Sequence, residues 1–212
     1  AVAAVLTHHA VAVGVGVFLN NGTNVTQARA RAYDGNAFVH AFLGDTGQAF
    51  YEHGFCAHAN QLYDEVMKVP LVVRYPGVGH QVSDLSLQHV DVPPMVLSLL
   101  ELPPHPGFQG NWEAAASGHG MPRFLVTHTT LSNQVGVVHG GWKLLYDLDF
   151  GTFHLYHLQE DPAERIDLSR DNPQQALRLG SLLADWVFSQ LDYYQDRTRQ
   201  GGEFPPRLLM EK

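Results

Sequence analysis

The 212-residue sequence has little cysteine and lacks a long apolar run. Its single cysteine, Cys56, excludes a disulfide within the chain and a cysteine-based zinc site. The longest apolar run, residues 10–19, is far shorter than the roughly 20 residues that span a bilayer. It also lacks the basic flank of a signal peptide, so we expect a buried strand there and no membrane span.

Charged residues are few, and acidic residues outnumber basic ones. Charged residues make up 16% of the chain and apolar residues 45%, which is typical of a globular protein with a substantial core. Asp and Glu outnumber Lys and Arg by 21 to 13, which gives a net charge of −8. This balance argues against partners such as nucleic acid or an anionic membrane. An anionic substrate would need a metal ion or local positive charge.

The first half of the chain alternates short apolar runs with turn signals. Residues 37–43 and 69–75 predict two buried strands. Residues 89–100 predict a helix entered through Asp91 and two prolines, because proline fits a first helical turn. Residues 103–122 are rich in proline and glycine and predict a long loop.

The second half predicts a small antiparallel sheet. Strands are expected at residues 123–129 and 153–158, with a hairpin around Gly140-Gly141 between them. The sequence therefore predicts two domains, an α/β domain over residues 1–122 and a sheet-plus-helix subdomain over residues 123–212.

A helix is expected from about residue 173. Asn172 can cap it, and Pro173 fits its first turn. Leu179, Leu183 and Trp186 lie on one face at helical spacing, which predicts that this face packs on the sheet.

Ionisable residues crowd the segment between the two predicted strands of the first half. In order along the chain stand Asp45-Thr46-Gly47, Glu52-His53-Gly54, Tyr63-Asp64-Glu65 and Val69-Pro70-Leu71. Further on come Val90-Asp91-Val92-Pro93, Trp142-Lys143-Leu144 and Asp161-Pro162-Ala163-Glu164. Taken in this order, the motifs resemble the C-terminal portion of the sulfatase family, within the alkaline-phosphatase superfamily. The resemblance runs from about residue 37 to residue 195.

This resemblance implies a fold and a chemistry. The fold would be α/β, part of an alkaline-phosphatase-like α/β/α layer followed by a small antiparallel β subdomain with a C-terminal helix. The activity would be hydrolysis of an anionic ester, a sulfuric ester in this family, with Ca²⁺ or Mg²⁺ held by oxygen ligands. Asp45 matches a metal ligand, and Thr46 stands where the family has Asn or His. His58 matches a position that contacts oxygens of the transferred group.

Other parts of the family's machinery do not occur in this sequence. The family's nucleophile is a formylglycine made from Cys or Ser in Cys/Ser-x-Pro-x-Arg, and no Cys, Ser or Thr here has a proline two residues later. No acidic residue precedes Asp34, so the family's early pair of Asp ligands is also missing. Cys56 is expected to be a buried, small apolar residue. We therefore expect no catalytic residue in the chain and no tight hold on Ca²⁺ or Mg²⁺.

These observations leave alternatives open. The chain can be the C-terminal portion of a sulfatase, partnered by a separate N-terminal half and inactive alone. It can be a non-catalytic binding protein built on the same remnant, or a phosphoric ester or phosphonate hydrolase of the superfamily. An active hydrolase that uses His53 or His58 by another mechanism is disfavoured by the absent nucleophile motif.

Overall fold

The computed structural model describes residues 3–7, 39–58, 60–75, 81–117, 120–200 and 202–206, with residues 3–7 as backbone alone. The strand expected at residues 10–19 lies outside them. The chain forms two compact units: residues 1–45 with 69–118 form unit 1, and residues 46–68 with 119–212 form unit 2. This division differs from the predicted one mainly in residues 46–68, which join the unit formed by the second half of the chain.

Unit 1 contains a mixed four-stranded sheet in the order β2-β5-β1-β6. The strands are β1 (Ala3–Thr7), β2 (His40–Leu43), β5 (Pro70–Arg74) and β6 (Gln81–Ser83). β5 runs antiparallel to both of its neighbours, whereas β1 and β6 are parallel. The predicted strands at residues 37–43, over its described part, and 69–75 are thus confirmed.

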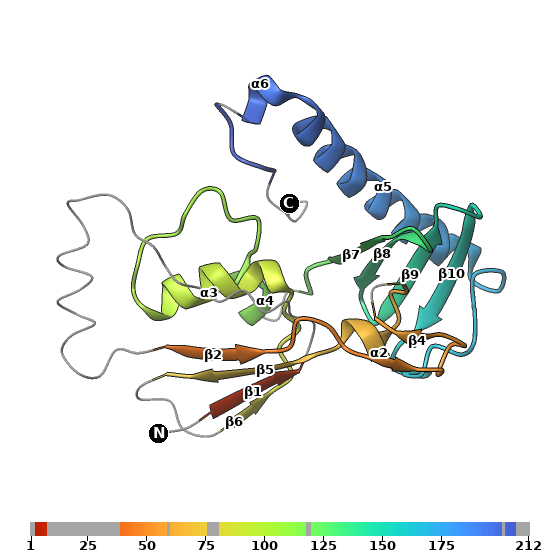
Figure 1. The fold of residues 1–212 in the computed structure, drawn as a ribbon, viewed down its shortest axis with the longest axis horizontal. Helices are drawn as coiled ribbons and strands as arrows, with labels where there is room; N and C mark the ends of the chain where they lie inside the picture. Colours follow the sequence, from red (N-terminus) through yellow and green to blue (C-terminus); the bar gives the residue numbers. More distant parts are fainter. Residues whose placement is uncertain are drawn as a thin grey trace. The chain divides into compact units, whose positions relative to one another are not determined.

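The core of unit 1 lies on one face of this sheet. The short turn η1 (His89–Asp91) leads into α3 (Val92–Leu99), which confirms the predicted helix. Leu71 and Val73 of β5 pack against Val92, Met95 and Val96. Figure 1 shows α3 and α4 on the same side of the sheet.

The predicted loop over residues 103–122 is interrupted by the short helix α4 (Trp112–Ala116). Its formation has a local cause, because the Asn111 side chain accepts a hydrogen bond from the Ala114 amide at 3.1 Å. The buried Asp91 carboxylate fixes the backbone at the start of α4. It accepts hydrogen bonds from the Asn111 amide at 2.7 Å and from the Gln88 amide at 2.8 Å. The loop prediction was wrong for these five residues.

The expectation that β2 is buried is also wrong. His40, Ala41 and Phe42 are exposed, and only Leu43 is partly covered. Their apolar character had suggested cover on both faces of the sheet. In the described residues, the packed core of unit 1 lies on one face alone.

Unit 2 is built on an antiparallel sheet in the order β10-β9-β8-β7. Its strands, all antiparallel to their neighbours, are β7 (Arg123–His128), β8 (Asn133–His139), β9 (Trp142–Asp147) and β10 (Thr152–His157). His139 pairs with Trp142, and Gly140 and Gly141 between them have φ of +60° and +80°. Glycine adopts such angles without strain, so the predicted hairpin is confirmed.

The long helix α5 (Pro173–Gln195) covers this sheet, followed by α6 (Arg197–Gln200). Leu179 and Leu183 are buried, and the Trp186 ring stacks on Phe124 with centroids 4.7 Å apart, as the sequence predicts. Asn172 holds the N-cap position, but its side chain makes no capping hydrogen bond. Among the described residues no helix is long and apolar enough to cross a membrane.

The segment 46–68 belongs to unit 2. It contains a small hairpin of β3 (Ala49–Phe50) and β4 (Cys56–Ala57), followed by α2 (Asp64–Met67). Cys56 is free and exposed, which corrects the expectation of a buried thiol. The reason is its place in a two-stranded ribbon, where it pairs with the exposed Phe50.

Candidate functional site

Asp45 and Thr46 follow the end of β2, where the backbone is tightly held. The Gly44 amide donates to the Pro70 carbonyl at 3.1 Å, and a Cβ at Gly44 would lie 3.1 Å from the Val69 Cβ. Asp45 and Thr46 are both exposed. Asp45 belongs to unit 1 and Thr46 to unit 2, so the chain passes from one unit to the other between these two residues.

His89 is a neighbour of Asp45 that the sequence did not single out. Burial lowers the pKa of His89 to about 4, while the negative charge of Asp45 acts in the opposite direction. Its Nε2 atom is buried without a hydrogen-bond partner. A neutral imidazole therefore lies in the electrostatic range of the Asp45 carboxylate. The His-Val-Asp sequence before α3 gave no sign of this, because the proximity depends on the tertiary fold.

His58 is exposed and follows β4 directly. Its Nδ1 atom lies 3.2 Å from Oε1 of Gln48, the residue that precedes β3. The hairpin register produces this contact, because Ala49 pairs with Ala57. Ala57 itself has φ of +102°, a strained value for a residue with a side chain.

The hairpin thus places His58 beside the residue two positions after Thr46. The roles that the resemblance implies for Asp45 and His58 concern residues of different units, and both stay predictions.

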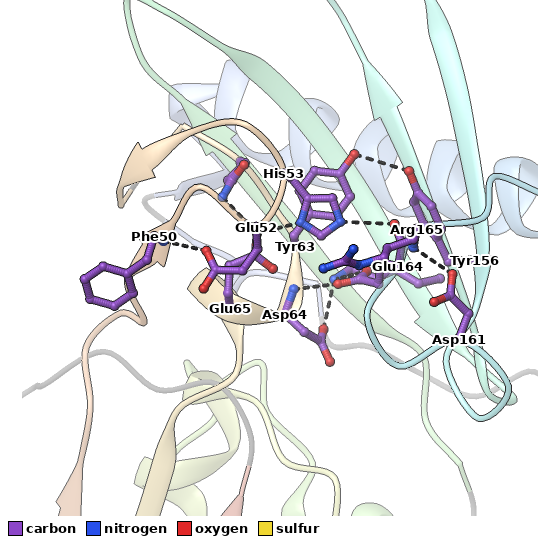
Figure 2. A network of polar contacts seen from close by, with 12 residues as sticks. Phe50, Glu52, His53, Tyr63, Asp64, Glu65, Tyr156, Asp161, Glu164 and Arg165 are labelled. Atoms are coloured by element: carbon purple, nitrogen blue, oxygen red, sulfur yellow. Dashed lines mark hydrogen bonds and ion pairs between the residues drawn. The ribbon is translucent and has the colours of Figure 1, made fainter.

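A buried polar network is the most developed cluster of ionisable side chains among the described residues (Figure 2). Lys143 of β9 is fully buried, with its Nζ atom 2.9 Å from Asp64 Oδ1 and 2.7 Å from Glu164 Oε1. Glu164 is 1% exposed, and its Oε2 atom accepts from the Asp64 amide at 2.6 Å. One ammonium group therefore lies between two carboxylates, one from α2 and one from the loop after β10.

Two effects on the pKa of Glu164 oppose each other in this network. Burial raises the pKa of the Glu164 carboxyl, and the nearby Lys143 ammonium counteracts this by favouring the ionised form. The ion pair with Lys143 and the hydrogen bond from the Asp64 amide compensate the negative charge of the buried Glu164 carboxylate. Removing any one member would leave an uncompensated ionic group in the interior.

His53 extends the network into the β3–β4 hairpin. Its Nδ1 atom lies 2.7 Å from Glu65 Oε1, and its Nε2 atom lies 3.1 Å from the Glu164 carbonyl oxygen. Its ring stacks on Tyr63 at 3.7 Å, with the planes 4° apart. Gln61 also donates to Glu65 Oε1, at 3.1 Å. His53 therefore holds the hairpin in place, which is a structural role.

Two tyrosines close the network on the sheet side. The hydroxyl oxygens of Tyr63 and Tyr156 lie 3.2 Å apart. Burial raises the pKa of both phenols, most strongly that of Tyr156, so both are neutral at physiological pH. Three sequence motifs far apart in the chain, Tyr63-Asp64-Glu65, Trp142-Lys143 and Pro162-Ala163-Glu164, thus meet at one buried point.

Comparison with curated proteins gives one relevant match. The chain is 24% identical over 138 residues to the uncharacterised sulfatase YidJ of Escherichia coli (strain K12). The match covers 61% of this chain and 28% of YidJ. No family model matches the sequence.

Solved structures agree with this match at the level of fold. BT4656, solved in complex with its substrate D-glucosamine-2-N,6-O-disulfate, superimposes with a TM-score of 0.61 at 18% identity over 78% of this chain and 36% of its own. The phosphonate monoester hydrolase SpPMH from Silicibacter pomeroyi gives a TM-score of 0.53 at 16% identity over 80% of this chain and 37% of its own. The chain is a homologue of the sulfatases. Its fold is the α/β fold of these structures, with a small antiparallel sheet and a C-terminal helix.

The chain spans well under half the length of these two proteins, 28% of YidJ and 36% of BT4656. Sulfatase homology raises the question of a divalent cation. The described residues contain no group of three or more His, Cys, Asp or Glu side chains that could hold a metal ion. Ca²⁺ takes six to eight oxygen ligands, and Asp45 with Thr46 could offer only a few. The described residues do not make a site for the cation by themselves.

Proposed function

We propose that this chain supplies the C-terminal part of a sulfatase-type hydrolase of anionic esters and does not hydrolyse them alone. The observation that carries this proposal is sulfatase homology without a Cys/Ser-x-Pro-x-Arg motif. The homology supports the reaction class, and the missing motif supports inactivity of this chain taken alone. Activity then needs residues that this chain does not contain.

The substrate we propose is a sulfate ester, carried by a carbohydrate. Support comes from BT4656, whose bound substrate is a disulfated glucosamine. A second candidate is a phosphonate or phosphoric ester, supported by the likeness to SpPMH. The two candidates share an anionic group with equatorial oxygens, so both would draw on the same positive or hydrogen-bonding groups.

His58 is the residue we assign to substrate contact, and Asp45 with Thr46 to part of a cation site. His58 Nδ1 is engaged with Gln48 at 3.2 Å, which orients the imidazole ring. Because the Gln48 oxygen can only accept, Nδ1 is the donor in this contact, and the opposite ring nitrogen donates to an oxygen of the ester only in the imidazolium form. Asp45 and Thr46 would contribute a carboxylate and a hydroxyl oxygen, and other ligands must come from outside this chain.

The first test is hydrolysis by the purified chain. With Ca²⁺ or Mg²⁺ present, we expect no release of 4-nitrophenol from its sulfate or its phosphate above the buffer rate. Metal-dependent turnover that is lost in Asp45→Ala and kept in Asp84→Ala, a change at another exposed aspartate of unit 1, would contradict the proposal.

The second test addresses the site itself. Titration with inorganic sulfate should shift the ring signals of His58 in a proton–nitrogen NMR spectrum, and leave those of the exposed His128 unchanged. Equal shifts at both histidines would indicate nonspecific anion binding and would remove His58 from the site.

A further inference from the structure

One face of the β3–β4 hairpin combines an aromatic ring, an amide and an imidazole. Ala49 is fully buried, whereas its neighbours Gln48 and Phe50 are exposed, so both point away from the body of unit 2. Phe50 pairs with the exposed Cys56 across the hairpin, and the contact between His58 and Gln48 places the imidazole on the same face. We call the exposed surface formed by Gln48, Phe50 and His58 the hairpin face.

The Phe50 ring is presented to solvent on a fixed backbone. Its side chain is 71% exposed, although an aromatic side chain of this size ordinarily contributes to a core. Figure 2 shows the ring pointing away from the buried polar network of unit 2. The Phe50 amide donates to Oε2 of Glu52, and this contact fixes the backbone that carries the ring. Hydrogen bonds from its own amide and from the Phe50 amide hold the pKa of the Glu52 carboxyl below its usual value.

The backbone is strained beside two members of the hairpin face. Tyr51, which follows Phe50, has φ of +72°, and Ala57, which precedes His58, has φ of +102°. Residues with a side chain adopt such angles at an energetic cost, and strain of this kind clusters at functional sites. The two strained positions therefore favour a function for the side chains next to them.

The hairpin face offers the groups that a sulfated sugar requires. The C–H groups on one side of a pyranose ring can pack against the negative face of the Phe50 ring. The amide NH2 group of Gln48 can donate to a sugar hydroxyl, and the imidazolium form of His58 can donate to a sulfate oxygen. The charged Glu52 carboxylate would accept from hydroxyls and repel a sulfate group. We therefore expect the sulfate at the end of the face where His58 lies.

We propose that the hairpin face binds the sugar ring of a sulfated carbohydrate, and that Phe50 is the residue that contacts the ring. This inference rests on the proposed function, because it places the carbohydrate beside the histidine assigned to its sulfate group. The combination of groups favours this occupant. A single aromatic ring bordered by polar groups is far smaller than a stable protein interface, which buries about 800 Å² of each partner.

The single cysteine of the chain supplies the readout, because Cys56 lies opposite Phe50 in the hairpin. Alkylation of Cys56 by iodoacetamide is timed in the purified full chain at constant ionic strength. The probes are D-glucosamine-2-N,6-O-disulfate, which is the substrate of BT4656, together with glucosamine and inorganic sulfate. At about 10 mM, the disulfated sugar should slow alkylation by about threefold, as a dissociation constant of about 5 mM implies. Glucosamine and inorganic sulfate should slow it much less.

Variants at Phe50 separate an aromatic contact from a general apolar one. Phe50→Leu should weaken binding of the disulfated sugar about fivefold, because the aromatic face is lost. Phe50→Trp restores an aromatic face and should bind like the unchanged chain. The matched control is Phe150→Leu, at a side chain of unit 2 that is 81% exposed, and it should change nothing. The comparison of the three probes needs no variant, so the proposal stays testable if Phe50→Leu fails to fold.

Equal protection by the disulfated sugar and by inorganic sulfate would overturn the proposal. Equal affinities of Phe50→Leu and Phe150→Leu for the sugar would also overturn it. Stronger protection by phenyl sulfate would replace the sugar with an aryl ester, and protection that rises with chain concentration alone would replace it with a second copy. Failure of the proposed function is a different result, namely ester hydrolysis by the purified chain alone, whatever protects Cys56.

Discussion

The two four-stranded sheets of the molecule bury their side chains to different extents. In unit 2, Val137, Leu144 and Leu155 of three successive strands are fully buried in the core that includes α5. In unit 1, side chains are described for β2, β5 and β6, and of these strands only β5 contributes buried side chains, Leu71 and Val73. The difference teaches that strand pairing does not by itself make a core, because each face also needs a covering layer.

Buried polar groups do not repeat the contrast. Unit 2 buries Lys143 and Glu164 and pairs them closely, which links β9 to the loop after β10. Both units nevertheless contain buried side-chain atoms without a hydrogen-bond partner, such as His89 Nε2 in unit 1 and His139 Nδ1 in unit 2. The two sheets therefore differ in how far their apolar side chains are covered.

The largest effect is expected for Lys143→Met. The buried Glu164 carboxylate and the partly buried Asp64 carboxylate would lose their counter-ion, which costs about 3–5 kcal/mol of unfolding free energy. Urea unfolding followed by the fluorescence of Trp142 and Trp186 reports on unit 2. Lys68→Met, at an exposed lysine of the same unit, is the control and should change little. A cost below about 1 kcal/mol for Lys143→Met would mean that the network does not hold unit 2 together.

Leu179→Ala should destabilise unit 2 by about 3 kcal/mol, because it opens a cavity under α5 at a side chain with no exposed surface. Leu177→Ala, on the same helix but 74% exposed, should change stability by less than about 0.5 kcal/mol. Equal costs in urea unfolding would show that α5 does not cover the sheet with the face described.

Unit 1 should lose stability in mild acid through His89. Its pKa is lowered from 6.5 to about 4 in the folded chain, so between these values the unfolded chain binds more protons. Stability is then fully present above about pH 6.5 and falls as pH drops toward 4, by roughly 1–2 kcal/mol after allowance for solvent screening. Urea unfolding followed by Trp112 fluorescence should show this slope, and His89→Leu should remove it. An unchanged slope in His89→Leu would assign the acid sensitivity to other groups.

The smallest effect concerns Cys56. Because the thiol is exposed, Cys56→Ser should alter the unfolding free energy by less than about 0.5 kcal/mol. The folded chain should react with a thiol reagent at close to the rate of a free thiol. If the Cys56 thiol reacted only in the presence of denaturant, it would be buried, as the sequence predicted.

Much of unit 2 could be predicted from the sequence, because its signals are local. Gly140-Gly141 fixes a hairpin, and Leu179, Leu183 and Trp186 repeat at helical spacing. The neighbours of Lys143 could not be predicted in the same way. Asp64 and Glu164 come from distant parts of the chain, and only the fold brings them within 2.9 Å and 2.7 Å of its amine.

Unit 1 was harder to predict for a physical reason. The apolar run of β2 indicates burial, but burial depends on what covers the strand. The helix α4 depends on one side-chain contact from Asn111, within a stretch whose prolines and glycines indicate a loop. For the candidate site, the order of the motifs singled out Asp45, Thr46 and His58. The proximity of His89 to Asp45 in unit 1 could not be predicted, because it depends on the tertiary structure.

The most direct test of the contrast is native-state hydrogen exchange of the chain alone. Amides paired between β8 and β9 should exchange only through global unfolding of unit 2, and hence most slowly. Amides of β2 and β6 should exchange through openings that are lower in free energy by at least roughly 2 kcal/mol. Equal protection in the two sheets would contradict the account, since it would mean that unit 1 is already a complete layer.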